Sequence, residues 1–169
     1  MHIIMGMGKN KTGFTLLEMV VVLAVIIVLS GLILPQVNRV ITKARIAKAQ
    51  AELEHIKSAM LAYKEDVGEL PPAGSTPSEA NLDGSSAESA LLSDDGSTGW
   101  NGPYLDSSIG TDPWGNHYRY EDNDGRSGRP VSYLLSYGPD GAKDISNPHT
   151  TSPSGIDDDI YVVVYNDGD

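Results

Sequence analysis

The residues best suited to chemistry in this sequence are aspartates that bracket a long loop near the C-terminus. They are Asp140, Asp144, Asp157, Asp158 and Asp159, and the loop between them is rich in Gly, Ser, Pro and Thr. Ca²⁺ takes about six to eight oxygen ligands at about 2.4 Å, and carboxylates supply them. Successive carboxylates repel one another unless a cation intervenes, and a loop without an apolar anchor needs something to order it. The pattern fits either a calcium site or a solvated acidic loop.

A second acidic segment lies earlier in the chain, where Asp122 and Asp124 precede Gly125. This spacing looks like part of an EF-hand loop, which requires a further acid before these residues and a glutamate after them. Tyr120 and Val131 occupy those two positions. The segment is therefore predicted to be a hairpin turn.

Other motifs that carry chemistry are missing from the sequence. No H-E-x-x-H, phosphate-binding glycine loop or G-x-S-x-G occurs. The histidines do not pair at metal-site spacing: they are His2, His55, His117 and His149. The sequence therefore indicates a protein that is not an enzyme.

The charge of the chain is unevenly distributed. Its net charge is −11, and the part after Gly68 carries −14, from 4 basic and 18 acidic residues. Such a surface repels nucleic-acid phosphate and lacks the basic patch that DNA or RNA binding requires. The chain has no cysteine, so the domain must be stabilised by packing or by a bound ion rather than by disulfides.

The longest apolar segment of the sequence covers residues 14–34, and Glu18 is its one charged residue. As a helix this run spans about 32 Å at ~1.5 Å per residue, enough for a bilayer core of roughly 30 Å. Lys9 and Lys11 precede it without an acid. By the positive-inside rule they predict a cytoplasmic N-terminus and a C-terminal part outside the cytoplasm.

Glu18 distinguishes this run from ordinary targeting segments. A secretory signal has a shorter apolar core and a small-residue cleavage site, whereas this run leads into Pro35 and a helical pattern. A charge inside hydrocarbon costs roughly 3 kcal/mol or more and usually marks function. The residues alone leave two interpretations of Glu18, a functional carboxylate or a charge tolerated near the membrane edge.

A helical pattern continues beyond the apolar run. Apolar residues recur at spacings of three and four and form one stripe: Leu53, Ile56, Met60, Tyr63 and Val67. Gly68 and the following Pro71-Pro72 end the pattern. We expect one helix from about residue 15 to about residue 66, with its stripe packed on the domain's own sheet. Four basic residues follow the apolar run on this helix: Arg39, Lys43, Arg45 and Lys48. Three interpretations are open for them, namely contact with lipid head groups, contact with acidic surfaces of neighbouring subunits, or exposure to solvent.

Strand patterns gather in the C-terminal third of the chain. Three strands are expected, over residues 117–121, 131–137 and 160–165, and a short helix is expected within residues 79–92. Val131, Tyr133, Leu135 and Tyr137 alternate, and the sheet face with the larger apolar side chains should face the long helix. The fold class is therefore α+β, a long N-terminal helix, half transmembrane and half amphipathic, packed on a small antiparallel sheet.

Three groups of motifs resemble a known family. Lys11-Thr-Gly-Phe-Thr-Leu-Leu-Glu18 resembles the class III leader and N-terminus of type IV pilins and pseudopilins. Trp100-Asn-Gly-Pro-Tyr-Leu105 and Asp112-Pro-Trp-Gly-Asn116 resemble the region between helix and sheet of the major pseudopilin of type II secretion, and Ser136-Tyr-Gly-Pro-Asp-Gly141 resembles its first calcium-loop segment. The resemblance covers most of the chain, except residues 73–98, and implies a pilin-like fold.

The resemblance implies a processing and assembly function for the N-terminus. Residues 1–13 would be a prepilin leader that a prepilin peptidase removes by cleavage between Gly13 and Phe14, after which the Phe14 amine is methylated. Residues 14–35 would be the transmembrane and filament-core helix, and residues 36–169 a periplasmic globular domain. Glu18 would pair with the Phe14 ammonium of a neighbouring subunit, because a buried carboxylate needs an opposite charge.

For the acidic loop, the resemblance implies calcium bound by Asp140, by carboxylates among Asp157, Asp158 and Asp159, and by backbone carbonyls such as that of Tyr137. The loop is longer than is usual in the family. The resemblance therefore leaves open which of the late aspartates are ligands.

The function implied is that of a subunit of the type II secretion pseudopilus, a homopolymer with minor pseudopilins. An inner-membrane platform and an ATPase would assemble it to drive protein export across the outer membrane. Two alternatives remain. One is a surface type IV pilin for adhesion, motility or DNA uptake, and the other is a membrane-tethered calcium-binding or receptor-like module that never polymerises.

Overall fold

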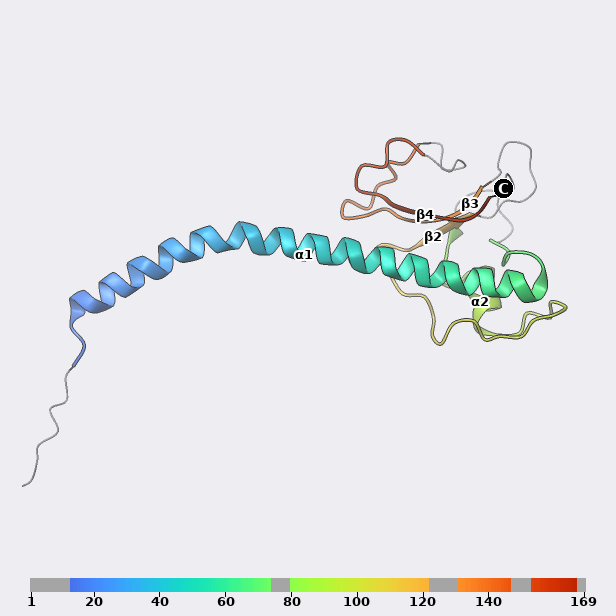
Figure 1. Ribbon diagram of the computed structural model, residues 1–169, viewed down its shortest axis with the longest axis horizontal. Coiled ribbons are helices and arrows are strands. Elements are labelled where there is room, and N and C mark those ends of the chain that lie inside the picture. Colours follow the sequence, from blue (N-terminus) through green and yellow to red (C-terminus); the bar gives the residue numbers. More distant parts are fainter. Residues whose placement is uncertain (1–12, 74–79, 122–130, 147–152, 167–169) are drawn as a thin grey trace, which may run out of the picture. The chain divides into compact units, whose positions relative to one another are not determined.

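The computed structural model describes residues 13–73, 80–121, 131–146 and 153–166. The chain divides into two compact units, one ending at Ile41 and the other beginning at Thr42. In chain order the elements are α1 (Leu16–Val67), β1 (Ala80–Asn81), α2 (Ser86–Leu92), β2 (Arg119–Glu121), β3 (Val131–Ser136) and β4 (Ile160–Asn166) (Figure 1). The predicted α+β class is confirmed.

Helix α1 begins at a capping box. The Thr15 hydroxyl oxygen accepts a hydrogen bond from the Glu18 backbone N–H at 3.2 Å, and Glu18 Oε2 accepts from the Thr15 backbone N–H at 2.8 Å. Two backbone N–H groups that a helix start leaves without partners are satisfied in this way. The helix ends at Val67, and Gly68 after it has φ +98° and donates its N–H to the Lys64 carbonyl at 2.8 Å. Glycine is favoured there because the left-handed conformation is strained for other residues.

The predicted apolar stripe of α1 forms the centre of the core. Leu53, Ile56, Met60 and Tyr63 are buried, and Val67 packs against them half-buried. They belong to one cluster with α2 and with one face of the sheet, and Figure 1 shows the strands lying along this part of α1. The prediction that the stripe packs on the domain's own sheet is therefore confirmed.

The sheet is antiparallel, with the order β1-β2-β3-β4. Three of its strands were expected, but β1 was not, because its two residues, Ala80 and Asn81, carry no alternating pattern. The predicted hairpin turn over residues 122–125 lies outside the described residues. Helix α2 occupies the end of the predicted window and is capped by the Ser85 hydroxyl, which accepts from the Glu88 N–H.

The two faces of the sheet are covered differently from what the alternation predicts. Leu134 and Val162 pack in the cluster of α1 and α2, whereas Tyr133, Leu135 and Tyr137 form a second cluster on the opposite face. The larger side chains of β3 thus point away from α1, and the expectation that they face the helix was wrong. The loop after β3 covers them, so every residue of β3 is buried.

The aromatic residues between helix and sheet serve packing, as predicted. Tyr104 makes edge-to-face contacts with Tyr63 and Trp100, with ring centroids 5.6 Å and 5.7 Å apart. The Trp100 indole N–H donates to the Ala90 carbonyl at 2.9 Å. Such contacts fix the connection between α2 and β2 against the end of α1.

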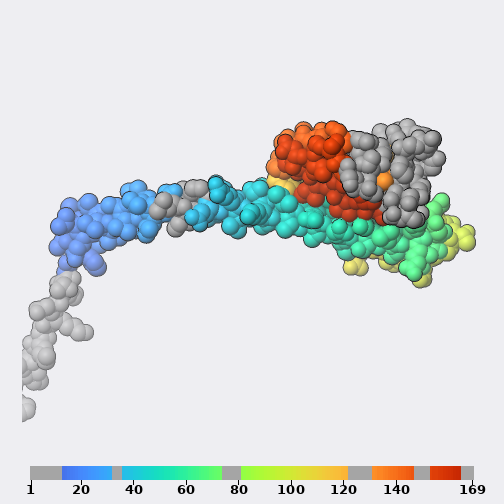
Figure 2. Space-filling view, turned by 45° about the horizontal axis from the view of Figure 1, so that its top comes forward, coloured from blue at the N-terminus to red at the C-terminus, as the bar shows by residue number. Residues whose placement is uncertain are grey.

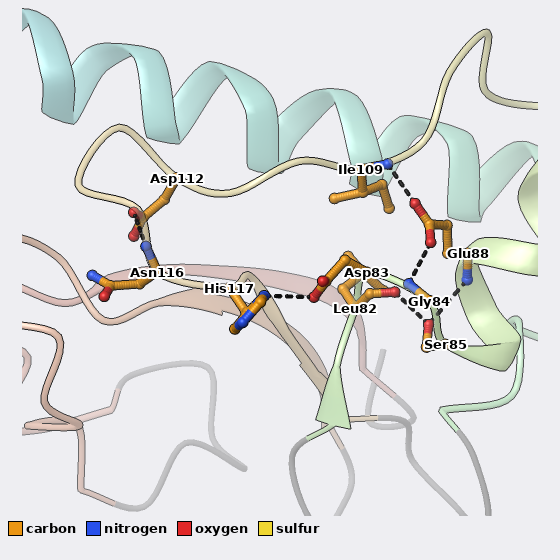
Figure 3. A network of polar contacts seen from close by, with 9 residues as sticks. All are labelled: Leu82, Asp83, Gly84, Ser85, Glu88, Ile109, Asp112, Asn116 and His117. Carbon is orange, nitrogen blue, oxygen red and sulfur yellow. Dashed lines mark hydrogen bonds and ion pairs between the residues drawn. The ribbon is translucent and has the colours of Figure 1, made fainter.

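A buried carboxylate organises the connection between α2 and β2. Glu88 is 6% exposed, and its two oxygens accept hydrogen bonds from the backbone N–H groups of Gly84 and Ile109 (Figure 3). The same turn is linked to the segment before β2, where His117 Nδ1 lies 2.8 Å from Asp83 Oδ1; this contact is a hydrogen bond when Nδ1 carries a proton. Glu88 therefore fixes the loop that contains Ile109 relative to α2.

Replacing Glu88 with alanine is expected to destabilise the domain by about 2 to 4 kcal/mol, because the backbone N–H groups of Gly84 and Ile109 lose their charged, part-buried acceptor. Urea unfolding of residues 36–169 measures this change. Glu65→Ala, at an exposed position of α1, is the control, and it should stay within about 0.5 kcal/mol. Equal effects of the two substitutions would contradict a structural function for Glu88.

Candidate functional sites

The acidic loop brings three carboxylates together. Oxygen atoms of Asp140, Asp144 and Asp158 all lie within 4.8 Å of one another. Ligand oxygens about 2.4 Å from one ion are separated by at most twice that distance, so these three oxygens are close enough together to bind the same Ca²⁺ ion. The predicted ligand set contained Asp140 and the three late aspartates, among which it did not choose, and of those three Asp158 belongs to this group. Asp144 was left out of the predicted set, although it follows Asp140 in the same loop.

Backbone geometry at Gly138 holds the two sides of this group together. Gly138 has φ +63°, and a Cβ placed on it would lie 2.3 Å from the Asp158 carbonyl oxygen. Its own carbonyl accepts a hydrogen bond from Asn116 Nδ2 at 2.8 Å. On the other side of the turn, Asp140 Oδ1 accepts from the Ala142 N–H at 2.8 Å. The segment before Asp140 can approach the Asp158 backbone closely because residue 138 has no side chain.

Crowding of negative charge is visible in the acid–base behaviour of the group. A hydrogen bond shared with Asp158, burial and the nearby charge of Asp140 raise the pKa of Asp144 to about 6. An acid whose pKa is raised in the folded state destabilises that state above this pKa and is relieved as the pH falls through it. The ionised form of Asp144 is therefore unfavourable in this loop at neutral pH.

Asp159 has a structural function in the same loop. Its Oδ2 accepts hydrogen bonds from the backbone N–H groups of Asp144 and Ile145, at 2.8 Å and 2.7 Å. Burial raises its pKa, and those two hydrogen bonds act in the opposite direction. Its Oδ1 is buried and lacks a hydrogen-bond partner among the described residues, so this oxygen is available to a cation but is not one of the three converging atoms.

The remaining predicted ligands lie elsewhere. Asp157 is exposed, has φ +38° in a turn, and is not part of the carboxylate group. The ring of Tyr137 lies 5.0 Å below the Arg119 guanidinium, and the function of its carbonyl stays a prediction. The loop also has an apolar anchor that sequence reasoning missed, since Ile145 is 4% exposed in the cluster on the outer face of the sheet.

Substituting Gly138 with alanine is expected to cost about 3 kcal/mol, combining left-handed strain with a clash against the Asp158 backbone. The matched control is Gly84→Ala, which has a similar φ of +68° but nothing within 4 Å of the added Cβ. Thermal melting of residues 36–169 measures both. If the two substitutions lower the melting temperature equally, the close approach to Asp158 is not important.

The second candidate site is the start of α1. Phe14 is 80% exposed, and Gly13 before it is also exposed, so the predicted cleavage position between them is accessible. Helix α1 is long and apolar enough to cross a membrane, with a mean hydropathy of 2.9 over an 18-residue window. Residues 1–12, with Lys9 and Lys11, lie outside the described residues. The Glu18 carboxylate accepts from Thr15, and the capping box gives it a local function that sequence reasoning did not include.

An apolar helix start with an accessible Gly-Phe junction, followed by an α+β domain, defines the class of type IV pilin-like proteins. A family model described as a prokaryotic N-terminal methylation motif matches residues 8–34. The model of type II secretion system protein G matches residues 36–151, which is more than half of the chain.

Named relatives agree with the family models. The type II secretion system core protein G of Aeromonas hydrophila is 28% identical over 152 residues, which cover 90% of this chain and 92% of the relative. The core protein G of Pseudomonas aeruginosa is 29% identical over 115 residues, which cover 66% of this chain and 74% of the relative. No solved structure matches. The chain belongs to the family of type II secretion system protein G, and it is a structural subunit of the pseudopilus, as predicted.

Proposed function

We propose that the chain is inserted once in the inner membrane with its C-terminal domain in the periplasm, is cleaved between Gly13 and Phe14 and methylated at Phe14, and then polymerises. The observation that supports this order of events is the accessible junction directly before an apolar helix that matches a methylation motif. A prepilin peptidase acts on the chain in this scheme. The chain performs no catalysis itself.

The assembled state is a homopolymer with minor pseudopilins, built by the membrane platform and its ATPase to export folded proteins. The exposed apolar side chains of α1 support polymerisation, because outside the membrane they must be covered by other helices. In the polymer Glu18 pairs with the Phe14 ammonium of a neighbour. The carboxylate exchanges its hydrogen bonds from Thr15 for a charge-assisted bond between subunits.

Calcium is the proposed ligand of the acidic loop. Asp140, Asp144 and Asp158 would hold it, because their oxygens converge, and the hydrogen bond with Asp158 and the nearby charges that raise the pKa of Asp144 are consistent with this. The ion would stabilise the folded loop and would take no part in a reaction, since binding to the folded state alone adds to folding free energy.

The processing scheme is tested by mass spectrometry of the chain extracted from membranes of cells with and without the prepilin peptidase. The expected mature chain begins at Phe14 and carries the mass of one methyl group on its N-terminus. Gly13→Ala is the matched variant, and it should leave the precursor uncut. An uncut wild-type chain in cells that contain the peptidase would contradict the proposal.

A further inference from the structure

The turn of residues 111–117, before β2, is closed by its own hydrogen bonds. Its first and last residues pair as an antiparallel bridge, and the Asp112 N–H donates to the Asn116 carbonyl at 2.8 Å. The Asp112 carboxylate is 4% exposed, and its Oδ1 accepts from the backbone N–H groups of Trp114 and Asn116, at 3.0 Å and 2.8 Å. Figure 3 shows the second of these bonds. The shape of the turn is therefore set by its own residues.

This turn is hydrogen-bonded to the chain that leads into the acidic loop. Asp112 Oδ2 accepts from the Ser136 hydroxyl at 2.6 Å, and the Ser136 hydroxyl oxygen in turn accepts from the Gly138 N–H at 3.2 Å. Asn116 Nδ2 donates to the Gly138 carbonyl at 2.8 Å. Both backbone groups of Gly138 are therefore held from the side of the turn.

The Asn116 amide also lies close to the other end of the segment that carries Asp140. Residues 138–141 form a turn, and a Cβ placed on Gly141, which has φ +70°, would lie 3.0 Å from Asn116 Oδ1. One side chain from outside the acidic loop thus lies against both ends of this turn, and Asp140 lies between those ends.

The other carboxylates of the group are held by a different residue. Asp159 Oδ2 accepts from the Asp144 backbone N–H at 2.8 Å, whereas the Asp140 N–H is 3.4 Å from Asp158 Oδ2, near the limit for a hydrogen bond. The described parts of both segments, orange and red in Figure 2, form one lobe of the surface. The position of Asp140 within this lobe therefore depends on how the turn of residues 138–141 is held.

We propose that Asn116 is a positioning residue for the calcium site, because it holds the turn of residues 138–141 so that the Asp140 carboxylate stays with the other two. The inference rests on the proposed calcium binding and adds to it a residue that does not touch the ion. Groups that orient metal ligands from outside the coordination sphere are needed for full affinity. The motif from Asp112 to Asn116 thereby has a function beyond the packing of its tryptophan.

Isothermal titration of calcium into the full-length chain in detergent micelles tests this function. Asn116→Ala removes the donor to Gly138 without changing the charge, and it should raise the calcium dissociation constant about 10- to 100-fold. The titration is made at a temperature at which circular dichroism shows wild type and variant folded without calcium. The control is Asn101→Ala, the same substitution at an exposed position outside this turn, and it should bind calcium as the wild type does.

Asn116→Asp separates the hydrogen bond from the charge. Aspartate has nearly the same size as asparagine, but its carboxylate accepts and cannot donate to the Gly138 carbonyl. An added negative charge by itself tightens the binding of a cation, so a raised dissociation constant in this variant assigns the effect to the lost donor. A lowered dissociation constant would overturn the proposal.

The remaining outcomes separate this inference from the proposed calcium site. Calcium binding by the wild type with unchanged affinity in Asn116→Ala would overturn the positioning function and leave the calcium site standing, whether or not the melting temperature falls. Absence of calcium binding by the wild type would overturn both. If Asn116→Ala does not fold without calcium, the titration of Asn116→Asp decides the result.

Discussion

Glu18→Gln should abolish pseudopilus assembly while leaving the precursor in the membrane and its C-terminal domain folded. Glutamine can accept the hydrogen bonds of a capping box as glutamate does, so the cap that Thr15 and residue 18 form at the start of α1 is preserved. Glutamine cannot neutralise the Phe14 ammonium of a neighbour. An uncompensated buried charge costs about 3 to 5 kcal/mol, which lowers association by two or more orders of magnitude.

The measurement is filament yield by electron microscopy together with secretion of an exoprotein, in cells whose own copy is deleted. Glu18→Asp keeps the charge with a shorter reach and should retain part of the assembly. Glu18→Ala loses both the cap and the charge. If Glu18→Gln assembles as well as the wild type and Glu18→Ala does not, the carboxylate acts through the capping box and the proposed pairing is wrong.

Removal of calcium should lower the stability of the C-terminal domain. For residues 36–169, calcium at a hundred times its dissociation constant is expected to add about 2.7 kcal/mol to the free energy of unfolding, or roughly 10 °C in melting temperature. The gain should vanish with chelator and in Asp158→Ala, because Asp158 is one of the converging carboxylates. Differential scanning calorimetry with and without calcium measures it.

Asp157→Ala provides the matched control for that experiment. Asp157 is adjacent to Asp158, and its substitution removes the same charge. Its side chain, however, is exposed and lies outside the carboxylate group. It should keep most of the calcium-dependent gain. Loss of the gain in both variants would show that net charge rather than a defined site is responsible. No calcium-dependent shift in the wild type would return the loop to the alternative of a solvated acidic surface.

The sequence predicted the long helix and its buried stripe because a three-four spacing allows one arrangement, in which Leu53, Ile56 and Met60 share a face. The sheet was harder to predict. Alternation shows which side chains of β3 share a face of the sheet. It does not show which face packs on the helices and which is covered by the loop after β3. The covering of Tyr133 and Leu135 depends on Ile145, a single apolar residue in a polar loop, and one residue gives no periodic signal.

The acidic site was predicted in part for a similar reason. Composition brought the aspartates to notice, but the choice among them depends on local backbone geometry. Asp158 joins Asp140 and Asp144 because a tight turn and the absence of a side chain at Gly138 direct it there. Asp159 instead supports the loop backbone. The adjacent aspartates Asp157, Asp158 and Asp159 thus have three different environments. Because the three residues are of the same type, the sequence does not predict this difference.

The burial of β3 on both faces has a consequence for observing this subunit inside a filament. Its residues Val131–Ser136 are all buried, and the strand lies between β2 and β4 in the sheet. Amide protons in such a strand exchange with solvent through opening of the whole domain rather than through local fluctuation. Hydrogen–deuterium exchange at Leu134 therefore reports the global stability of the folded domain in assembled pseudopili, where a melting curve would also record dissociation of the polymer.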